Sequence, residues 1–106
     1  MIRITVTKDE LSVRGHAHEG EGPVTKTETE ACAAVTALVH QLYLSMRVLG
    51  HEGDTARVSF LQGNFILRER QKISTVSEVF LTGFLIGAKA VSTAYPEQIE
   101  FIDCCD

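Results

Sequence analysis

Residues 15–37 read GHAHEGEGPVTKTETEACAAVTA, and both the fold and the candidate chemistry depend on this stretch. It begins where a strand would end, continues through an acidic run broken by glycines and a proline, and finishes in residues that favour a helix. This order places His16 at the end of a strand and Cys32 in the opening turns of a helix. A thiol and an imidazole can form a nucleophile and its base where a fold brings two such positions together.

The chain before this stretch predicts a β-hairpin. Apolar and polar residues alternate over 2–7 and again over 11–14, with a polar turn at 8–10 between them. If the alternation continues past the second strand, Gly15 lies on the core side and His16 on the open side of the sheet. The imidazole is then expected to emerge where the strand leaves the sheet.

The chain after the acidic run predicts a long helix over about 30–49. Its apolar residues recur at the spacing of one helical face, which must lie against the sheet. Two starts fit the sequence: Thr27 as N-cap with Glu30 completing a capping box, or Thr29 as N-cap. Both starts place Cys32 within about two turns of the helix N-terminus.

The remaining sequence predicts a second hairpin and a second helix. The hairpin spans 58–67 and turns at Gly63–Asn64, two residue types that tolerate positive φ. A helix capped by Ser74 or Ser77 then extends to about residue 93. Because this helix is apolar on nearly all sides, we expect it to be the more buried of the two.

A last short strand over 99–102 completes the order ββαββαβ. The predicted fold is α+β: a two-layer sandwich with two helices on a mainly antiparallel sheet. A chain of 106 residues has the usual size of one domain, so we expect a single domain over 1–106.

Charge and cysteine content exclude several classes of protein. A net charge of −4 argues against direct nucleic-acid binding and favours a basic peptide as partner. The alternating N-terminus is not a signal peptide, and no apolar run is long enough for a bilayer, so we expect a cytoplasmic protein without membrane contact. Three cysteines, two of them adjacent at Cys104 and Cys105, do not form a disulfide framework, and we regard that pair as incidental.

Cys32 has two interpretations. Near a helix N-terminus, its thiolate would be stabilised by the helix dipole, and free N–H groups there could bind an oxyanion. Alternatively, the alanines around Cys32 indicate a small buried apolar residue. The sequence does not identify an Asp or Asn that would orient His16, so the candidate is a Cys–His dyad with an open third position.

The pair His16 and His18 raises the question of a metal site. On a continuing strand both rings would face one side and could bind a metal together with Cys32 or Glu19. The glycines after His18 interrupt the strand, so we interpret His18 as a solvated loop residue. A metal-binding protein therefore ranks third among the functional hypotheses, and we expect neither a metal nor another cofactor.

Four segments together resemble a known family. The strings SVRGHA at 12–17, CAAVTAL at 32–38, LIG at 85–87 and YPEQI at 95–99 are similar to the bacterial ribosomal-processing cysteine protease family, Prp. The likeness covers nearly the whole chain, and the combination of Gly-His-Ala with Cys-Ala-Ala-Val is its most specific part.

This resemblance implies a homodimeric thiol protease, a hydrolase that removes the N-terminal extension of large-subunit ribosomal protein twenty-seven during ribosome biogenesis. It assigns His16 as the general base and Cys32 as the nucleophile, and it implies substrates with aromatic residues just before the cut. It also implies that the loop between these two residues orders around the substrate. Positions expected to support the site or the substrate are Gly15, Thr29, Ala33 and Thr36.

The chain departs from the family pattern at three features. Thr29 stands where the family usually has Asp, and Thr36 where it usually has Ser. The loop between the two catalytic positions is also longer than is typical. The alternative hypothesis is therefore a non-catalytic, dimeric peptide-binding or ribosome-assembly module with the same fold.

Overall fold

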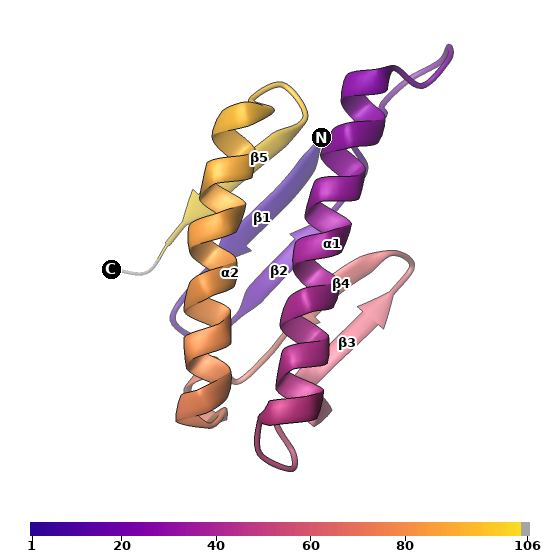
Figure 1. Cartoon of the computed structure of the whole chain (residues 1–106). Coiled ribbons are helices and arrows are strands. Elements are labelled where there is room, and N and C mark those ends of the chain that lie inside the picture. Colours follow the sequence, from indigo (N-terminus) through magenta and orange to yellow (C-terminus); the bar gives the residue numbers. More distant parts are fainter. Residues whose placement is uncertain (105–106) are drawn as a thin grey trace.

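The protein, described here over residues 1–104 by a computed structural model, is a five-stranded sheet with two helices side by side on one face (Figure 1). The sheet has the strand order β3-β4-β2-β1-β5. Every neighbouring pair is antiparallel except β1 and β5, which run parallel. These strands are β1 (Ile2–Val6), β2 (Leu11–Arg14), β3 (Val58–Leu61), β4 (Asn64–Leu67) and β5 (Ile99–Asp103). The predicted α+β class and the order ββαββαβ are confirmed.

The connections explain why both helices cover the same face. One helix links β2 to β3 and the other links β4 to β5, and the pairing directions make each linked pair of strands point the same way. The connection from β2 to β3 and the connection from β4 to β5 lead toward opposite edges of the sheet. They also start from strands, β2 and β4, that are antiparallel. With the usual right-handed connection, both helices must then lie on one side.

The two predicted hairpins are present. In the first, Ile4 is paired with Val13 and Val6 with Leu11, and all four side chains are buried under the helices. The second turns at Gln62 and Gly63, which both have positive φ, so the prediction of a turn at Gly63–Asn64 is wrong by one residue. Asn64 is the first residue of β4 instead. The buried apolar residues of the sheet and the helices form one core, which comprises Ile2, Ile4, Val6, Leu11, Val13, Ala17, Ala31, Val35, Val39, Leu42, Met46, Phe65, Leu67, Leu81, Phe84, Ala88 and Ile99.

Helix α1 (Lys26–Leu49) begins earlier than the sequence pattern predicted. Its N-cap is Thr25, whose hydroxyl accepts a hydrogen bond of 3.1 Å from the Glu28 N–H, and Glu28 in return accepts one of 2.8 Å from the Thr25 N–H. The predicted caps Thr27 and Thr29 are therefore wrong. Threonines and glutamates alternate here and offer more than one capping box, and the glutamate of the box that forms, Glu28, also contacts His18 in the preceding loop.

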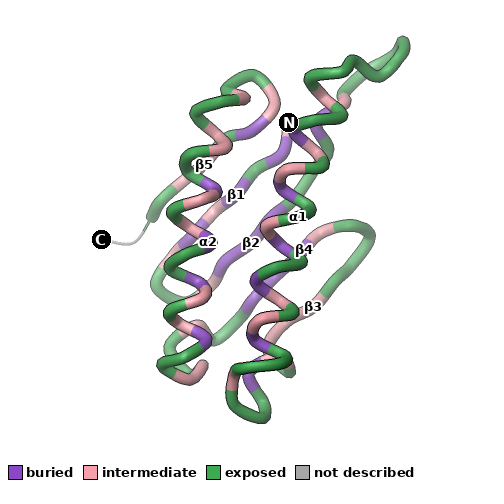
Figure 2. The backbone as a smooth tube through the Cα atoms, viewed as in Figure 1, coloured by how far each residue is buried: buried purple, intermediate pink, exposed green. Residues whose placement is uncertain are grey.

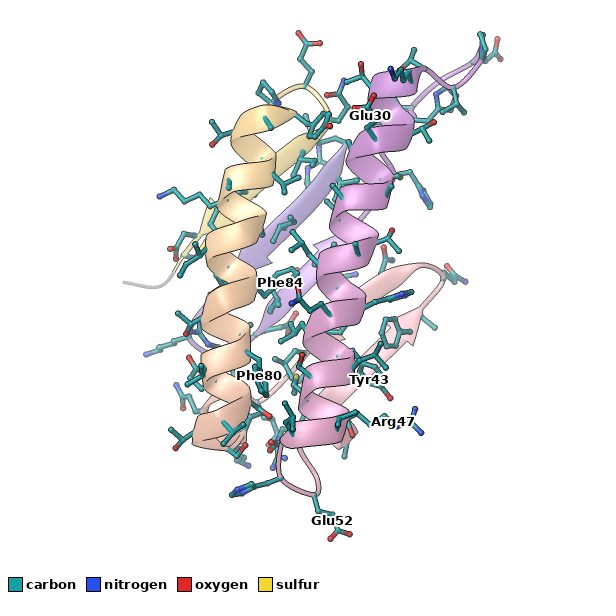
Figure 3. All side chains as sticks on the ribbon, viewed as in Figure 1. Glu30, Tyr43, Arg47, Glu52, Phe80 and Phe84 are labelled. Atoms are coloured by element: carbon teal, nitrogen blue, oxygen red, sulfur yellow. The ribbon has the colours of Figure 1, made fainter. Side chains whose placement is uncertain are left out.

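Helix α2 (Thr75–Ala94) is capped by Ser74, one of the two predicted caps, through the Ser77 N–H. Its inner side contributes Phe80 and Phe84, which lie between the two helices (Figure 3). The expectation that α2 is the more buried helix is wrong. Val79 is 63% and Ile86 is 70% exposed, because the helices form a single layer and nothing within residues 1–104 covers their outer side (Figure 2).

The expectation that no segment resembles a membrane span also needs correction. Each helix contains an 18-residue window with a mean hydropathy of 1.3, which is enough by length and composition alone to cross a membrane. The core helix of a soluble protein reaches the same value, and both helices here pack one face on the sheet. Two short 3₁₀ helices, η1 (Thr55–Arg57) and η2 (Arg70–Lys72), complete the structure.

The thiols of Cys32 and Cys104 are free, and Cys104 is exposed just after β5. The other residue of the terminal pair, Cys105, lies outside the described residues.

Candidate active site

The backbone at the end of β2 decides where His16 lies. Gly15 has a φ of +90°, and a Cβ at this position would collide with the carbonyl oxygen of Met1. Its N–H donates a hydrogen bond of 3.2 Å to the side-chain oxygen of Asn64. The strand alternation ends at Arg14, and Gly15 and His16 line the same cavity, so the prediction that they lie on opposite sides of the sheet is wrong. The positive φ turns the chain so that His16 lines cavities on the helix side of the sheet.

Cys32 lies in the second turn of α1, is partly buried and packs against the core. Two cavities meet at this residue, and His16 lines both of them. The apolar cavity, of about 340 Å³, is lined by Ile2, Val13, Gly15, His16, Cys32, Val35, Thr36, Val39, His40, Phe60, Gly63 and Phe65. The loop cavity, of about 410 Å³, is lined by His16, His18, Val24, Glu28, Thr29 and Cys32.

The structure thus brings His16 and Cys32, which are far apart along the chain, to the walls of the same two cavities. Among the described residues, no hydrogen bond joins the imidazole to the thiol. Catalytic contacts of this kind often tighten only when substrate binds. The catalytic dyad of His16 and Cys32 remains a prediction, which requires that both residues line one cavity, as they do here.

Two aromatic residues, Phe60 and Phe65, line the apolar cavity, and Tyr43 packs against Phe60. Phe60 makes edge-to-face contacts with Tyr43 and Phe65, with ring centroids 5.3 Å apart in both pairs. Tyr43 extends from α1 over the β3–β4 hairpin (Figure 3). A concave wall of this composition suits an apolar or aromatic side chain of a bound peptide.

His18 is a partly buried residue with a specific partner, so the prediction of a solvated loop residue is wrong. Its Nδ1 lies 3.2 Å and 3.1 Å from the two carboxylate oxygens of Glu28. Hydrogen bonds to the Glu28 carboxylate, first from the backbone of Thr25 and then from His18, lower the pKa of Glu28. Glu28 therefore connects the loop to the first turn of α1.

The other end of the loop is held near the N-terminus. The terminal ammonium of Met1 donates a hydrogen bond of 2.6 Å to the carbonyl oxygen of His16 and forms an ion pair with Glu19. The hydrogen bond from this ammonium, together with its charge, lowers the pKa of Glu19. The two histidines thus lie in a segment that is tethered at both ends.

Three of the four predicted supporting residues lie around Cys32. Gly15 and Thr36 line the apolar cavity, while Thr29 lines the loop cavity and its hydroxyl donates a hydrogen bond of 3.1 Å to the Thr25 carbonyl oxygen. Ala33 is exposed and lines neither cavity, so its supporting role stays a prediction.

The expected oxyanion site depends on free N–H groups at the start of α1, and two of these groups are already hydrogen-bonded. With Thr25 as the cap, the Glu28 N–H bonds the Thr25 hydroxyl and the Thr29 N–H bonds the Thr25 carbonyl oxygen. Both groups belong to the first turn, whereas Cys32 lies in the second, and the dipole effect falls off within one turn. These two helix-start amides are therefore already hydrogen-bonded and lie one turn before Cys32.

Sequence reasoning set His18 aside as a solvated loop residue and missed Glu28 and Phe60, which also line the two cavities. A signal for His18 was present, because residues two apart in an extended segment share a side, and His16 was already a candidate. Within residues 1–104, no group of three or more His, Cys, Asp or Glu side chains is arranged to hold a metal ion.

Comparison with solved structures agrees with the fold of this chain. Two structures of the ribosomal processing protease Prp from Staphylococcus aureus, one with a covalently linked product peptide and one with a substrate peptide, match with TM-scores of 0.70 and 0.72. Their sequence identities to this chain are 16% and 15%, and each match covers 97% of this chain and 99% of the other. SMU.848 from Streptococcus mutans matches with a TM-score of 0.69 at 20% identity, over 100% of this chain and 96% of its own.

Among curated proteins, no sequence matches this chain significantly. The sequence model of the family described as "Cysteine protease Prp" matches residues 1–100, which is nearly the whole chain. The resemblance inferred from the four sequence segments is therefore confirmed. By this match the chain belongs to the Prp family and is a cysteine protease.

Proposed function

We propose that this protease uses Cys32 as its nucleophile and His16 as the general base. The observation that carries the proposal is that these two residues line both cavities at the junction of the loop and α1. His16 accepts the thiol proton, and the thiolate attacks the carbonyl carbon of the scissile peptide bond. The protonated imidazole then gives its proton to the leaving amine, and a water molecule hydrolyses the thioester.

The proposed substrate is the N-terminal extension of large-subunit ribosomal protein twenty-seven. Family membership supports this substrate, as do the peptide complexes of the Staphylococcus aureus protease. The apolar cavity beside Cys32 fits an aromatic residue just before the cut, and a net charge of −4 favours a basic peptide. The proposal excludes direct nucleic-acid binding.

The test is incubation of the purified protein with a tagged precursor of ribosomal protein twenty-seven. We expect wild type to release the extension, and Cys32→Ala and His16→Asn to leave the precursor intact. Cys104→Ser, which changes an exposed thiol far from the site, is the matched control and should cut at the wild-type rate. Binding of the precursor without any cut by wild type would favour the peptide-binding module instead.

We further propose that residues 1–106 form a single domain that works in the cytoplasm as a homodimer. The exposed apolar residues on α2 support self-association, because a monomer rarely leaves such a stripe in contact with water. A cytoplasmic location keeps the Cys32 thiol reduced, as the nucleophile must be. Cell fractionation tests the location, and sedimentation velocity of the full chain tests the dimer.

A further inference from the structure

A second imidazole faces the loop cavity beside Cys32. His16 and His18 lie on either side of Ala17, whose side chain is buried in the core. Both line the loop cavity together with the Cys32 side chain. The proposed mechanism uses only the first of these rings.

The contact with Glu28 orients the ring of His18. A carboxylate accepts hydrogen bonds and does not donate them, so the Nδ1 atom that lies 3.1 Å and 3.2 Å from its oxygens carries the proton. In the neutral ring, the other nitrogen, Nε2, is then an unprotonated acceptor. This is the tautomer that a base needs when a carboxylate holds its other nitrogen.

Glu28 is itself held in place by the start of α1. Its carboxylate accepts the Thr25 N–H at 2.8 Å, and its own N–H donates to the Thr25 hydroxyl. The orienting group therefore belongs to a rigid helix end. By contrast, the ring of His16 has no hydrogen-bond partner among the described residues.

We propose that His18, oriented by Glu28, is a second general base for Cys32 and shares this task with His16. His18 Nε2 accepts the thiol proton, which leaves a thiolate and an imidazolium whose Nδ1–H stays on the Glu28 carboxylate. After thiolate attack, the imidazolium returns that proton to the leaving amine nitrogen. This inference rests on the proposed role of Cys32 as nucleophile.

Several titratable groups surround His18 and influence the measurement. They are Glu28 and Cys32 on α1, His16 in the same segment, and Glu19, which is paired with the N-terminal ammonium. Variants must therefore change one group at a time and keep its shape. Asn and Gln are suitable for this purpose, because the Asn amide reaches the Nδ1 position of a histidine and the Gln amide reaches the Nε2 position.

The experiment measures the rate at which iodoacetamide alkylates Cys32 between pH 5 and pH 9. It uses the full chain in a background that carries Cys104→Ser and Cys105→Ser, so that only one thiol reacts. His18→Asn keeps a donor toward Glu28 but has no nitrogen that accepts a proton. We expect its alkylation rate at pH 6 to fall about tenfold, with a profile that moves toward that of a free thiol but keeps the part of the activation that His16 supplies.

Three further variants make the result decisive. Glu28→Gln keeps an acceptor for Thr25 and His18 but removes the charge, and should shift the profile in the same direction by less. His16→Asn should lower the rate only in part, and the double variant with His18→Asn should lose the remainder. Thermal unfolding followed by circular dichroism controls for changes in folding.

A merely structural role for His18 gives a different pattern. If His18→Asn retains the wild-type profile while His18→Gln disturbs the fold, His18 is only a tether and the inference is overturned. It is also overturned if His16→Asn alone matches the double variant. Cleavage of the precursor by Cys32→Ala would instead contradict the proposed nucleophile, and alkylation would still report whether His18 activates this thiol.

Discussion

The hydroxyl of Ser77 donates a hydrogen bond of 2.5 Å to Oδ2 of Asp54, which joins the first turn of α2 to the turn that follows α1. Asp54 is only 3% exposed and also accepts bonds from the hydroxyl and N–H of Ser74 and from the N–H of His51. Burial would raise the pKa of Asp54, but these hydrogen bonds outweigh it and lower the pKa to about 2. The carboxylate therefore holds the two helices in register at the end opposite the candidate site.

Asp54 makes the stability of the protein depend on pH in acid. Because the pKa falls from 3.8 to about 2 on folding, the carboxylate stabilises the fold above about pH 4, and this contribution is lost as the pH falls through about 2. The full contribution is on the order of 2 kcal/mol. We expect Asp54→Asn to lower the free energy of unfolding at pH 7 and to flatten its decline below pH 4.

Urea unfolding at several pH values measures both effects. Asp9→Asn, which changes an exposed carboxyl group, is the control and should keep the wild-type pH dependence. An Asp54→Asn variant that still loses stability at the wild-type rate between pH 4 and pH 2 would contradict the assignment.

The capping box at the start of α1 predicts a contrast between two threonines. Thr25→Ala removes the acceptor for the Glu28 N–H and should reduce the free energy of unfolding by about 1 kcal/mol. Thr27→Ala lies just inside the helix, where alanine is favourable, and should change it by less than about 0.5 kcal/mol. Equilibrium unfolding in urea measures both variants. A larger loss of unfolding free energy in Thr27→Ala than in Thr25→Ala would contradict Thr25 as the N-cap.

Gly15 and Gly20 share a positive φ but differ in their surroundings. At Gly20 a Cβ would meet no atom within 4 Å, whereas at Gly15 it would collide with the Met1 carbonyl oxygen. We expect Gly20→Ala to cost at most about 1 kcal/mol, and Gly15→Ala to cost about 2 kcal/mol or more.

The two glycine variants should also differ in activity. The backbone shift forced by Gly15→Ala displaces the adjacent His16 and should reduce kcat for the precursor. Thermal unfolding and single-turnover cleavage measure the two effects, and equal behaviour of the variants would show that the contact with Met1 does not position His16.

The exposed apolar side of α2 predicts the surface of the proposed homodimer. Ile86→Asp places a charge in the middle of this side, and burying an unpaired charge in an interface is costly. We expect sedimentation velocity to show a shift from dimer to monomer while the helix content stays unchanged. Leu61→Asp, at an equally exposed position beside the β3–β4 turn, is the control. Dissociation by Leu61→Asp and not by Ile86→Asp would place the interface elsewhere.

Local pattern alone predicted much of the fold. Alternation in β1 and β2 identified their inner faces, and the apolar stripe of α1 identified the side that meets the sheet. The motif around His16 and Cys32 identified the family, since it requires only residue identity and approximate spacing. These features depend on residues that are close in sequence, where side-chain periodicity and backbone preferences act directly.

Other features depended on the tertiary structure. Glycine permits either sign of φ, so the turn at Gly15, and with it the side on which His16 lies, depends on the neighbouring Met1 and Asn64. The choice of Thr25 as cap depends on Glu28, which also meets His18 across the loop.

By itself, then, the sequence determined the order of the elements, the apolar faces of β1, β2 and α1, and the family. The tertiary structure alone decided the parallel pairing of β1 with β5, the exposure of Ile86 and the meeting of His18 with Glu28. The physical reason is that periodicity specifies which side of an element is apolar, whereas partners and uncovered surfaces depend on how distant elements pack.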